Sequence, residues 1–183
     1  MTALLRFHDV ALRRGGRLLF EKMDFELAGG EALHVSGPNG SGKSSLIRLA
    51  AGLLRADRGE VHRAALALAD ENLALDRELP LRRALAFWGG QVDAAMEALG
   101  ILHLAEVPVR LLSSGQAKRA TLARLASSAA RLWLLDEPLN ALDAEGAERL
   151  SRLMDRHRAE GGTVLAASHQ PLLGQWRIVD LAR

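Results

Sequence analysis

Short apolar runs alternate along this chain with longer segments in which apolar residues recur every three or four positions. A short apolar run is typical of a strand buried on both faces, whereas the longer recurrence is typical of a helix with one buried face. The predicted strands and helices are, in chain order, 32–36, 45–51, a helical run that follows 113–116 and ends at about 128, then 132–135, 144–160 and 163–167. This alternation predicts an α/β fold with a mainly parallel sheet and helices on both of its faces.

The N-terminal part has a different pattern, in which short strand-like stretches are separated by glycine pairs. We expect strands at Leu4–Val10, Arg17–Phe20 and Asp24–Leu27, with turns at the glycine pairs 15–16 and 29–30. These stretches predict an antiparallel β patch beside the parallel core. A further strand is expected at 64–68.

The middle of the chain, residues 79–104, returns to helical spacing. Gly89 and Gly90 interrupt that spacing, so we expect two helices with a break between them. Pro108 closes the block. The pattern predicts a small helical subdomain inserted into the α/β core.

Composition argues against several classes of protein. A chain of 183 residues fits one domain with a sizeable core, and its net charge of +2 gives no reason to expect a nucleic-acid partner. No apolar run approaches the roughly 18 residues of a membrane span, and the first residues resemble a strand rather than a secretory signal. The absence of cysteine excludes disulfides and thiolate metal sites, so we expect a cytoplasmic protein.

The strongest chemical signal follows the first predicted core strand. Residues 37–44 have the pattern G-x-x-x-x-G-K-S, between a buried strand and a helix. The glycines allow successive backbone N–H groups to point at one phosphate, and the helix N-terminus adds partial positive charge. The lysine would reach the β- and γ-phosphates of a nucleoside triphosphate, and the serine after it would bind Mg²⁺. The residues of this candidate site are Gly37, Pro38, Asn39, Gly40, Ser41, Gly42, Lys43, Ser44 and Ser45.

Two acids, Asp136 and Glu137, follow the apolar strand 132–135. If this strand lies beside the strand of the phosphate loop, Asp136 would approach the metal through a water. Glu137 would then face the γ-phosphate and orient or deprotonate an attacking water. The alternative is an ordinary polar strand end before a helix. The phosphate loop favours the catalytic interpretation.

Two further segments are candidates for contact with phosphate. Residues 112–116, LSSGQ, precede a helix, so they would form either a second phosphate cradle or an ordinary cap by Ser113 or Ser114. One chain has one γ-phosphate to hold, so the cradle would act on a nucleotide bound by a second copy. His169 follows the strand 163–167 and would donate a hydrogen bond to the γ-phosphate; the alternative is a structural role.

Taken together, these motifs resemble those of the nucleotide-binding domain of ABC transporters, over nearly the whole chain. The matching segments are Walker A at 37–44, the signature at 112–116, Walker B at 132–137, the D-loop at 139–143 and the switch histidine His169. The resemblance implies a P-loop NTPase core with a small helical subdomain, which we expect at 1–70 plus 129–183 and at 71–128, respectively. It implies an ATPase that uses ATP and Mg²⁺.

The resemblance also implies an assembly. Two nucleotide-binding subunits would form a head-to-tail dimer, with ATP between Walker A of one and Ser113, Ser114, Gly115 and Gln116 of the other. Asp143 would act in the D-loop. Transmembrane permease subunits would be the partners, at the cytoplasmic face of the inner membrane.

Within that family the chain is most similar to the cytochrome c maturation ATPases, the ATP-binding subunits of the haem exporter. The features that carry this likeness are the compact length, the 35–49 segment, the strand LWLLDEP at 132–138 and the Ser168-His169-Gln170 ending. In that group ATP hydrolysis is associated with release of a haem-loaded chaperone.

The chain departs from the family pattern in three places. Asp70 and Glu71 stand where a Q-loop glutamine is expected; Glu71 could approach the metal, although a carboxylate cannot donate as an amide does. The chain has no tyrosine to stack on adenine, and an arginine at 13–14 would replace it. The signature has Ser114 where glycine is usual.

Other functions are compatible with parts of this pattern. The chain would then be the ATPase of another ABC transporter, or an ATP-binding regulatory subunit with low turnover, an alternative that the Glu71 departure leaves open. An ABC protein acting on ribosomes or DNA would carry two such domains or a long coiled coil, and this chain has neither.

Overall fold

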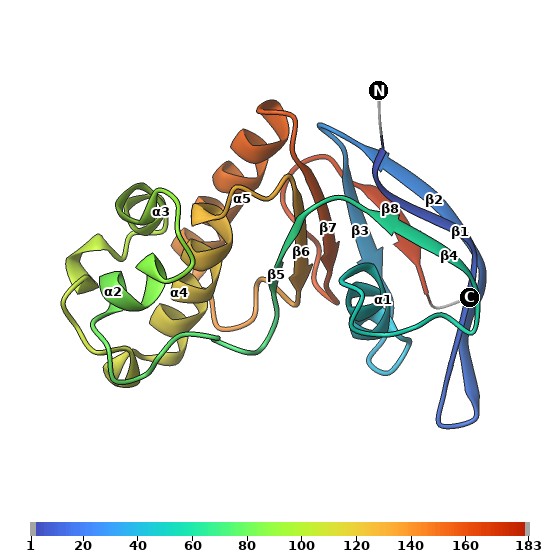
Figure 1. Ribbon diagram of the computed structural model, residues 1–183, viewed down its shortest axis with the longest axis horizontal. Coiled ribbons are helices and arrows are strands. Elements are labelled where there is room, and N and C mark those ends of the chain that lie inside the picture. Colours follow the sequence, from blue (N-terminus) through green and yellow to red (C-terminus); the bar gives the residue numbers. More distant parts are fainter. Residues whose placement is uncertain (1–2, 182–183) are drawn as a thin grey trace. The chain divides into compact units, whose positions relative to one another are not determined.

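A computed structural model of the protein describes residues 3–181 (Figure 1). The chain divides into two compact units. The first unit consists of the residues up to Leu68, Ala130–Pro138 and His157 onward, and the second consists of Ala69–Ala129 and Leu139–Arg156. Each unit is built around elements that the sequence pattern largely anticipates.

A five-stranded sheet organises the first unit, with the order β5-β6-β7-β3-β8 (Figure 1). The central strands are parallel: β3 pairs with β7 and β8, and β6 pairs with β7. The parallel core predicted from the apolar runs is therefore confirmed, while β8 was not predicted because its residues are mostly exposed. The strands are β3 (Ala32–Ser36), β5 (Leu66–Ala69), β6 (Leu132–Asp136), β7 (Thr163–Ala167) and β8 (Arg177–Asp180).

Helix α1, Lys43–Ala50, covers this sheet and contacts β6 and β7. Its apolar residues Leu46, Ile47 and Leu49 are buried in the same cluster as Leu33 of β3. Burial of such side chains contributes roughly 1.5–3 kcal/mol each. The helix that carries the phosphate-loop lysine is therefore held on the sheet by its buried apolar face.

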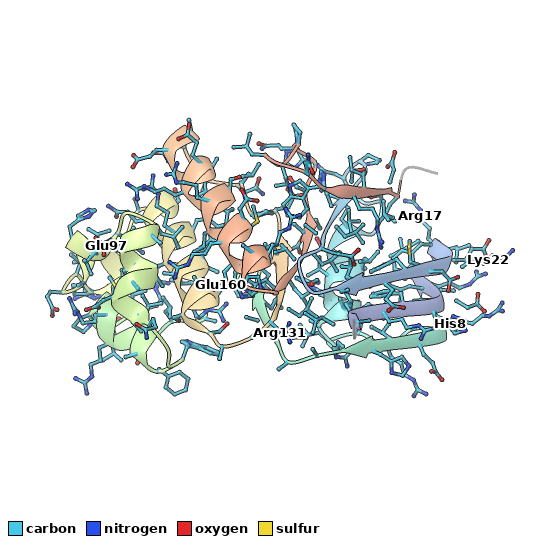
Figure 2. All side chains as sticks on the ribbon, turned by 90° about the horizontal axis from the view of Figure 1, so that it is seen from above. His8, Arg17, Lys22, Glu97, Arg131 and Glu160 are labelled. Atoms are coloured by element: carbon cyan, nitrogen blue, oxygen red, sulfur yellow. The ribbon has the colours of Figure 1, made fainter. Side chains whose placement is uncertain are left out.

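A three-stranded antiparallel sheet, ordered β2-β1-β4, forms the other part of the first unit. It consists of β1 (Ala3–Arg14), β2 (Arg17–Ala28) and β4 (Arg58–Arg63). Its apolar side packs into the core through residues such as Leu5, Phe7 and Leu27. The exposed residues His8, Arg17 and Lys22 are labelled in Figure 2.

The predicted β patch is confirmed, but its strand boundaries differ from the prediction. The stretches 17–20 and 24–27 are one strand, because the β1–β2 ladder continues through register shifts rather than ending. Strand β4 was missed since its sequence is polar and contains Gly59. A Cβ at Gly59 would lie 2.3 Å from the carbonyl oxygen of Asp9, so the glycine permits β4 to pair closely with β1.

The second unit is helical. Its segments are α2 (Leu81–Ala86), α3 (Val92–Ala98), the short 3₁₀ turns at Leu102–Leu104 and Val109–Leu111, α4 (Ser114–Ser127) and most of α5 (Ala144–Ala159). Helices α2, α3 and α4 pack against one another through buried residues that include Leu81, Leu85 and Met96. Within residues 3–181, no helix has the length and apolar composition needed to cross a membrane.

The predicted break between two helices is confirmed at Gly89 and Gly90, which separate α2 from α3. Gly90 has φ +80°, and a Cβ there would lie 1.5 Å from the carbonyl oxygen of Ser127. A side chain at this position would therefore clash with the end of α4.

A stacked ring pair, one ring buried and the other half-buried, lies at the end of α5 in the first unit. The imidazole of His157 stacks on the indole of Trp133, with ring centroids 3.8 Å apart. Its Nε2 contacts the carbonyl oxygen of Arg131 at 3.1 Å; Arg131 and the nearby Glu160 are labelled in Figure 2. Burial lowers the pKa of His157, and the Arg131 carbonyl and the Glu160 carboxylate oppose that effect.

We expect His157 to make stability depend on pH. Because folding lowers the pKa of His157, the unfolded chain binds a proton first as the pH falls. The free energy of unfolding should therefore decrease as the pH falls through and below the ordinary histidine pKa of 6.5. His157→Phe keeps a ring against Trp133 and cannot titrate, so its urea-unfolding free energy should lose less between about pH 7.5 and about pH 5.5 than that of the unsubstituted chain.

The matched control is His62→Gln, because His62 pairs with Glu60 on the surface. Exposed pairs contribute little to stability, so this variant should keep the pH dependence of the unsubstituted chain. Equal pH dependence in His157→Phe and the unsubstituted chain would contradict the assignment.

Candidate functional site

The loop between β3 and α1 has a backbone conformation that glycine allows. Gly37, Gly40 and Gly42 have φ values of +140°, +80° and +108°. A Cβ at Gly37 would lie 2.8 Å from Ser41 Oγ, and a Cβ at Gly42 would lie 3.2 Å from Leu19 Cβ. Glycines therefore let the loop curl at these positions without backbone strain.

The N-terminal turn of α1 is arranged to receive an anion. Gly42 is the N-cap residue and supplies no side-chain hydrogen bond to the first turn. Ser41 Oγ is buried and has no hydrogen-bond partner among the described residues. A buried hydroxyl without a partner is costly, and a phosphate oxygen would satisfy it together with the N–H groups at the helix end.

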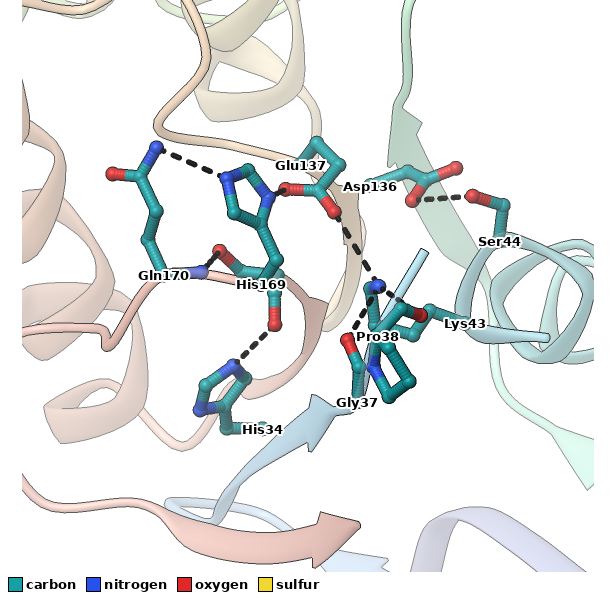
Figure 3. A network of polar contacts seen from close by, with 10 residues as sticks. His34, Gly37, Pro38, Lys43, Ser44, Asp136, Glu137, His169 and Gln170 are labelled. Atoms are coloured by element: carbon teal, nitrogen blue, oxygen red, sulfur yellow. Dashed lines mark hydrogen bonds and ion pairs between the residues drawn. The ribbon is translucent and has the colours of Figure 1, made fainter. Parts of the chain in front are cut away.

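Lys43 is buried and folds back over the loop that precedes it (Figure 3). Its Nζ donates to the carbonyl oxygens of Gly37 at 2.8 Å and Pro38 at 3.1 Å, and lies 3.9 Å from Glu137 Oε1. The ammonium group is thus held between the phosphate loop and the end of β6. A phosphate seated in the loop would lie within its reach.

Ser44 and Asp136 form a pair of oxygen donors (Figure 3). The hydroxyl of Ser44 donates to Asp136 Oδ1 at 3.0 Å. Asp136 ends β6, and Ser44 lies in the first turn of α1, so both positions are set by packed elements. A hydroxyl and a carboxylate suit Mg²⁺, which takes its remaining ligands from water and phosphate. In the described part of the chain no cluster of three histidine, cysteine or acidic side chains offers a metal site.

Glu137 and His169 contact each other at the ends of β6 and β7. His169 Nδ1 lies 2.9 Å from Glu137 Oε2, and the Nε2 amide of Gln170 lies 3.4 Å from His169 Nε2. Because an amide NH₂ donates, the Gln170 contact favours the tautomer in which His169 Nδ1–H donates to the carboxylate. The structure therefore joins the two residues that the sequence suggested separately.

Glu137 has a strained backbone that aims its side chain. Its φ is +46°, which is uncommon for a residue with a side chain, and its N–H donates to the carbonyl oxygen of Ala167 at 2.8 Å. Strain of this kind costs of order 1–3 kcal/mol and persists only where the surrounding structure imposes it. The carboxylate lies between Lys43 and His169 as a result.

A second histidine supports the first. His34, buried on β3, contacts the carbonyl oxygen of Ser168 through Nε2 at 3.1 Å, and the Ser168 hydroxyl accepts from the N–H of Gln170 at 3.0 Å. The sequence pattern alone does not assign His34 or Gln170 to this site. A histidine within an apolar strand was the available signal, because a buried imidazole needs a hydrogen-bond partner.

In the second unit, the 112–116 segment forms the start of α4. Ser113 is the N-cap: its Oγ accepts from the N–H of Gln116 at 3.3 Å, and the Gln116 side chain accepts from the N–H of Ser113 at 2.9 Å. This capping box leaves Ser114 as the first residue of the helix. Of the two candidate caps, Ser113 is thus the one observed.

Asp143 lies beside this segment in the same unit. Its Oδ1 accepts from the N–H of Gly146 at 2.8 Å, at the start of α5, and from the guanidinium of Arg119 at 2.5 Å. Both hydrogen bonds lower the pKa of Asp143, and the one from the Gly146 N–H has the larger effect. A pocket of about 270 Å³ is lined by His103, Ser113, Gln116, Arg119 and Asp143, among others.

Two of the departures from the family pattern are the acidic pair Asp70 and Glu71 and the arginines at 13–14. Asp70 accepts from the N–H of Asn72 at 2.9 Å in a tight turn of the second unit, and Glu71 is exposed there. The approach of Glu71 to a metal stays a prediction. Arg13 and Arg14 end β1, and stacking of an arginine on a base likewise stays a prediction.

Comparison with known proteins shows to which family the chain belongs. Residues 20–140 match the family model described as ABC transporter. A cytochrome c biogenesis ATP-binding export protein CcmA from Sphingopyxis alaskensis is 53% identical over 92% of this chain and 91% of that protein. The protein of the same name from Novosphingobium aromaticivorans is 55% identical over 90% of this chain and 87% of its own length.

Solved structures agree on the fold. An ATP-binding ABC transporter protein from Pyrococcus furiosus superposes with a TM-score of 0.86, at 19% identity, over 97% of this chain and 96% of that one. At this identity the likeness concerns the fold alone. The chain belongs to the ABC transporter family, and with its close relatives to the group of cytochrome c biogenesis ATP-binding export proteins.

Proposed function

We propose that this chain is the ATP-hydrolysing subunit of a membrane ABC complex that serves cytochrome c biogenesis. The observation that carries the chemistry is the placement of Glu137 between Lys43 and His169, at the edge of the sheet from which the phosphate loop starts. The names of the relatives support the cellular process.

The chain's own residues supply the hydrolytic steps. The curled loop at Gly37–Gly42 and the N-terminal turn of α1 bind the phosphates, and Lys43 exchanges its carbonyl contacts for the β- and γ-phosphates. Glu137 accepts a proton from the attacking water, or orients that water toward the γ-phosphate. His169 holds the carboxylate in place from the other side.

Ser44 and Asp136 would hold Mg²⁺, Asp136 through a water. Mg²⁺ held there would supply positive charge against the β- and γ-phosphate oxygens. The hydrogen bond between the two side chains keeps both oxygens at one place before the ion arrives.

We further propose that the active form is a dimer with two ATPs. Ser113, Ser114, Gly115 and Gln116 of one copy would contact the γ-phosphate held by the other, with Asp143 beside them. The partners would be transmembrane permease subunits, and this chain would lie at the cytoplasmic face of the inner membrane.

The division into a core of 1–70 and 129–183 and a helical subdomain of 71–128 also stays a proposal.

Glu137→Gln should abolish most turnover and leave ATP binding intact. An amide cannot accept a proton, and loss of a positioned general base typically lowers the rate by about 10²–10⁴-fold. Phosphate release under steady-state conditions measures turnover, and titration with a fluorescent ATP analogue measures binding. Glu148→Gln is the control, because Glu148 is an exposed acid paired with Arg152 on α5. Unchanged turnover in Glu137→Gln would refute the assignment of the base.

The cellular role is tested by capture of partners. The Glu137→Gln chain with Mg-ATP should retain its partners from detergent-solubilised source membranes, because hydrolysis no longer opens the complex. Recovery of cytochrome c biogenesis membrane subunits would support the proposal. Recovery of an unrelated permease would keep the ATPase chemistry and contradict the process.

Asp136→Asn should raise the Mg²⁺ concentration needed for half-maximal hydrolysis. Residues that hold a metal through its outer shell typically change metal affinity by about 10–100-fold when substituted. A Mg²⁺ titration of phosphate release at saturating ATP makes the measurement. Asp155→Asn, an exposed position on α5, should leave the titration unchanged. The same midpoint in Asp136→Asn and the unsubstituted chain would contradict the metal assignment.

A further inference from the structure

Two loops of the second unit lie in direct contact at the start of α4. The 139–143 loop turns at Ala141, whose φ is +65°, and brings its carbonyl oxygen to the backbone of Gly115. A Cβ at Gly115 would lie 3.0 Å from that oxygen, which is closer than most side-chain contacts. The glycine of the 112–116 motif thus permits the 139–143 loop to pack against the helix N-terminus.

Arg119 forms a second tie between the same two loops. It lies one helical turn after the motif, and its guanidinium donates to Asp143 Oδ1 at 2.5 Å and to the carbonyl oxygen of Leu99 at 3.4 Å. Its side chain is only 15% exposed, whereas that of Asp143 is 65% exposed. Arg119 is therefore the more buried member of the ion pair, and it holds the solvent-exposed carboxylate of Asp143.

The electrostatics keep this tie in place near neutral pH. The Gly146 N–H and the Arg119 guanidinium both stabilise the ionised form of Asp143, so its pKa is lowered. A charge-assisted hydrogen bond is roughly twice as strong as a neutral one. The end of the 139–143 loop is thus fixed to α4 and to the start of α5 at once.

We propose that Arg119 is a positioning residue that joins the 112–116 motif and the 139–143 loop into one preformed surface for the nucleotide held by a second copy of this chain. The inference rests on the proposed dimer. If the 139–143 loop were free, forming the dimer would require it to be ordered, and that entropy would weaken association. Arg119 removes most of this cost in advance.

A merely structural role for Arg119 predicts something different. Asp143 also caps α5, so disruption of the pair could simply destabilise the second unit. Asp143→Asn separates the two roles, because asparagine caps a helix about as well as aspartate but has no charge for Arg119. Arg149→Gln is the matched control: Arg149 pairs with Glu145 on α5 and donates to the carbonyl oxygens of Glu97 and Ala98 at the end of α3, and these contacts lie outside both loops.

The experiment measures ATP-dependent dimerisation in the Glu137→Gln background by analytical ultracentrifugation. Added Arg119→Gln or Asp143→Asn should raise the dimer dissociation constant about tenfold or more, and the double variant should be no worse than the more affected single one. Arg119→Lys, which keeps the charge but not the planar fork, should lie between. Affinity of the monomer for a fluorescent ATP analogue and the melting temperature should match those of Arg149→Gln.

Each outcome decides the matter. An unchanged dimer constant in both Arg119→Gln and Asp143→Asn would overturn the role of Arg119 while leaving the dimer intact. Additive effects of the two substitutions, or a loss of melting temperature that accounts for the weaker dimer, would also overturn it. If the Glu137→Gln chain does not dimerise with ATP at all, the proposed dimer itself is refuted, and the inference with it.

Discussion

The parallel register of three strands is the constraint on which the candidate site depends. Strand β7 pairs with both β3 and β6, so that Ala167 lies opposite Val35 on one side and Asp136 on the other. The segments that follow these strands therefore leave the sheet at the same edge. That edge receives the phosphate loop, Glu137 and His169 from parts of the chain that are far apart in sequence.

Several hydrogen bonds convert this proximity into defined geometry. The N–H of Glu137 extends the pairing of β6 to Ala167, which forces the residue into a left-handed conformation and aims its carboxylate. His34 fixes the segment next to His169, because its ring contacts the Ser168 carbonyl oxygen. Preorganised groups of this kind contribute to catalysis because they need not rearrange when charge develops. In the second unit, the hydrogen bond from Arg119 to Asp143 holds a loop in a defined position in the same way.

The places where sequence reasoning was wrong share a physical cause. The predicted stretches 17–20 and 24–27 belong to one strand, β2, because its pairing with β1 continues through register shifts. Strand β4 is polar because its residues are largely exposed, and Gly59 favours the close approach to β1 rather than a turn. Each of these depends on a neighbour that no local pattern reveals.

By itself the sequence determined the α/β class, the central strands, the break at Gly89 and Gly90, and the chemical type of the phosphate-loop and strand-end residues. These features follow from local periodicity and from the conformations that glycine, lysine and acidic residues permit within a few positions. Only the tertiary structure decided that His169 contacts Glu137, that His34 supports Ser168, and that Arg119 holds Asp143. Such pairs join residues from 24 to 134 positions apart, and folding alone brings them within hydrogen-bond distance.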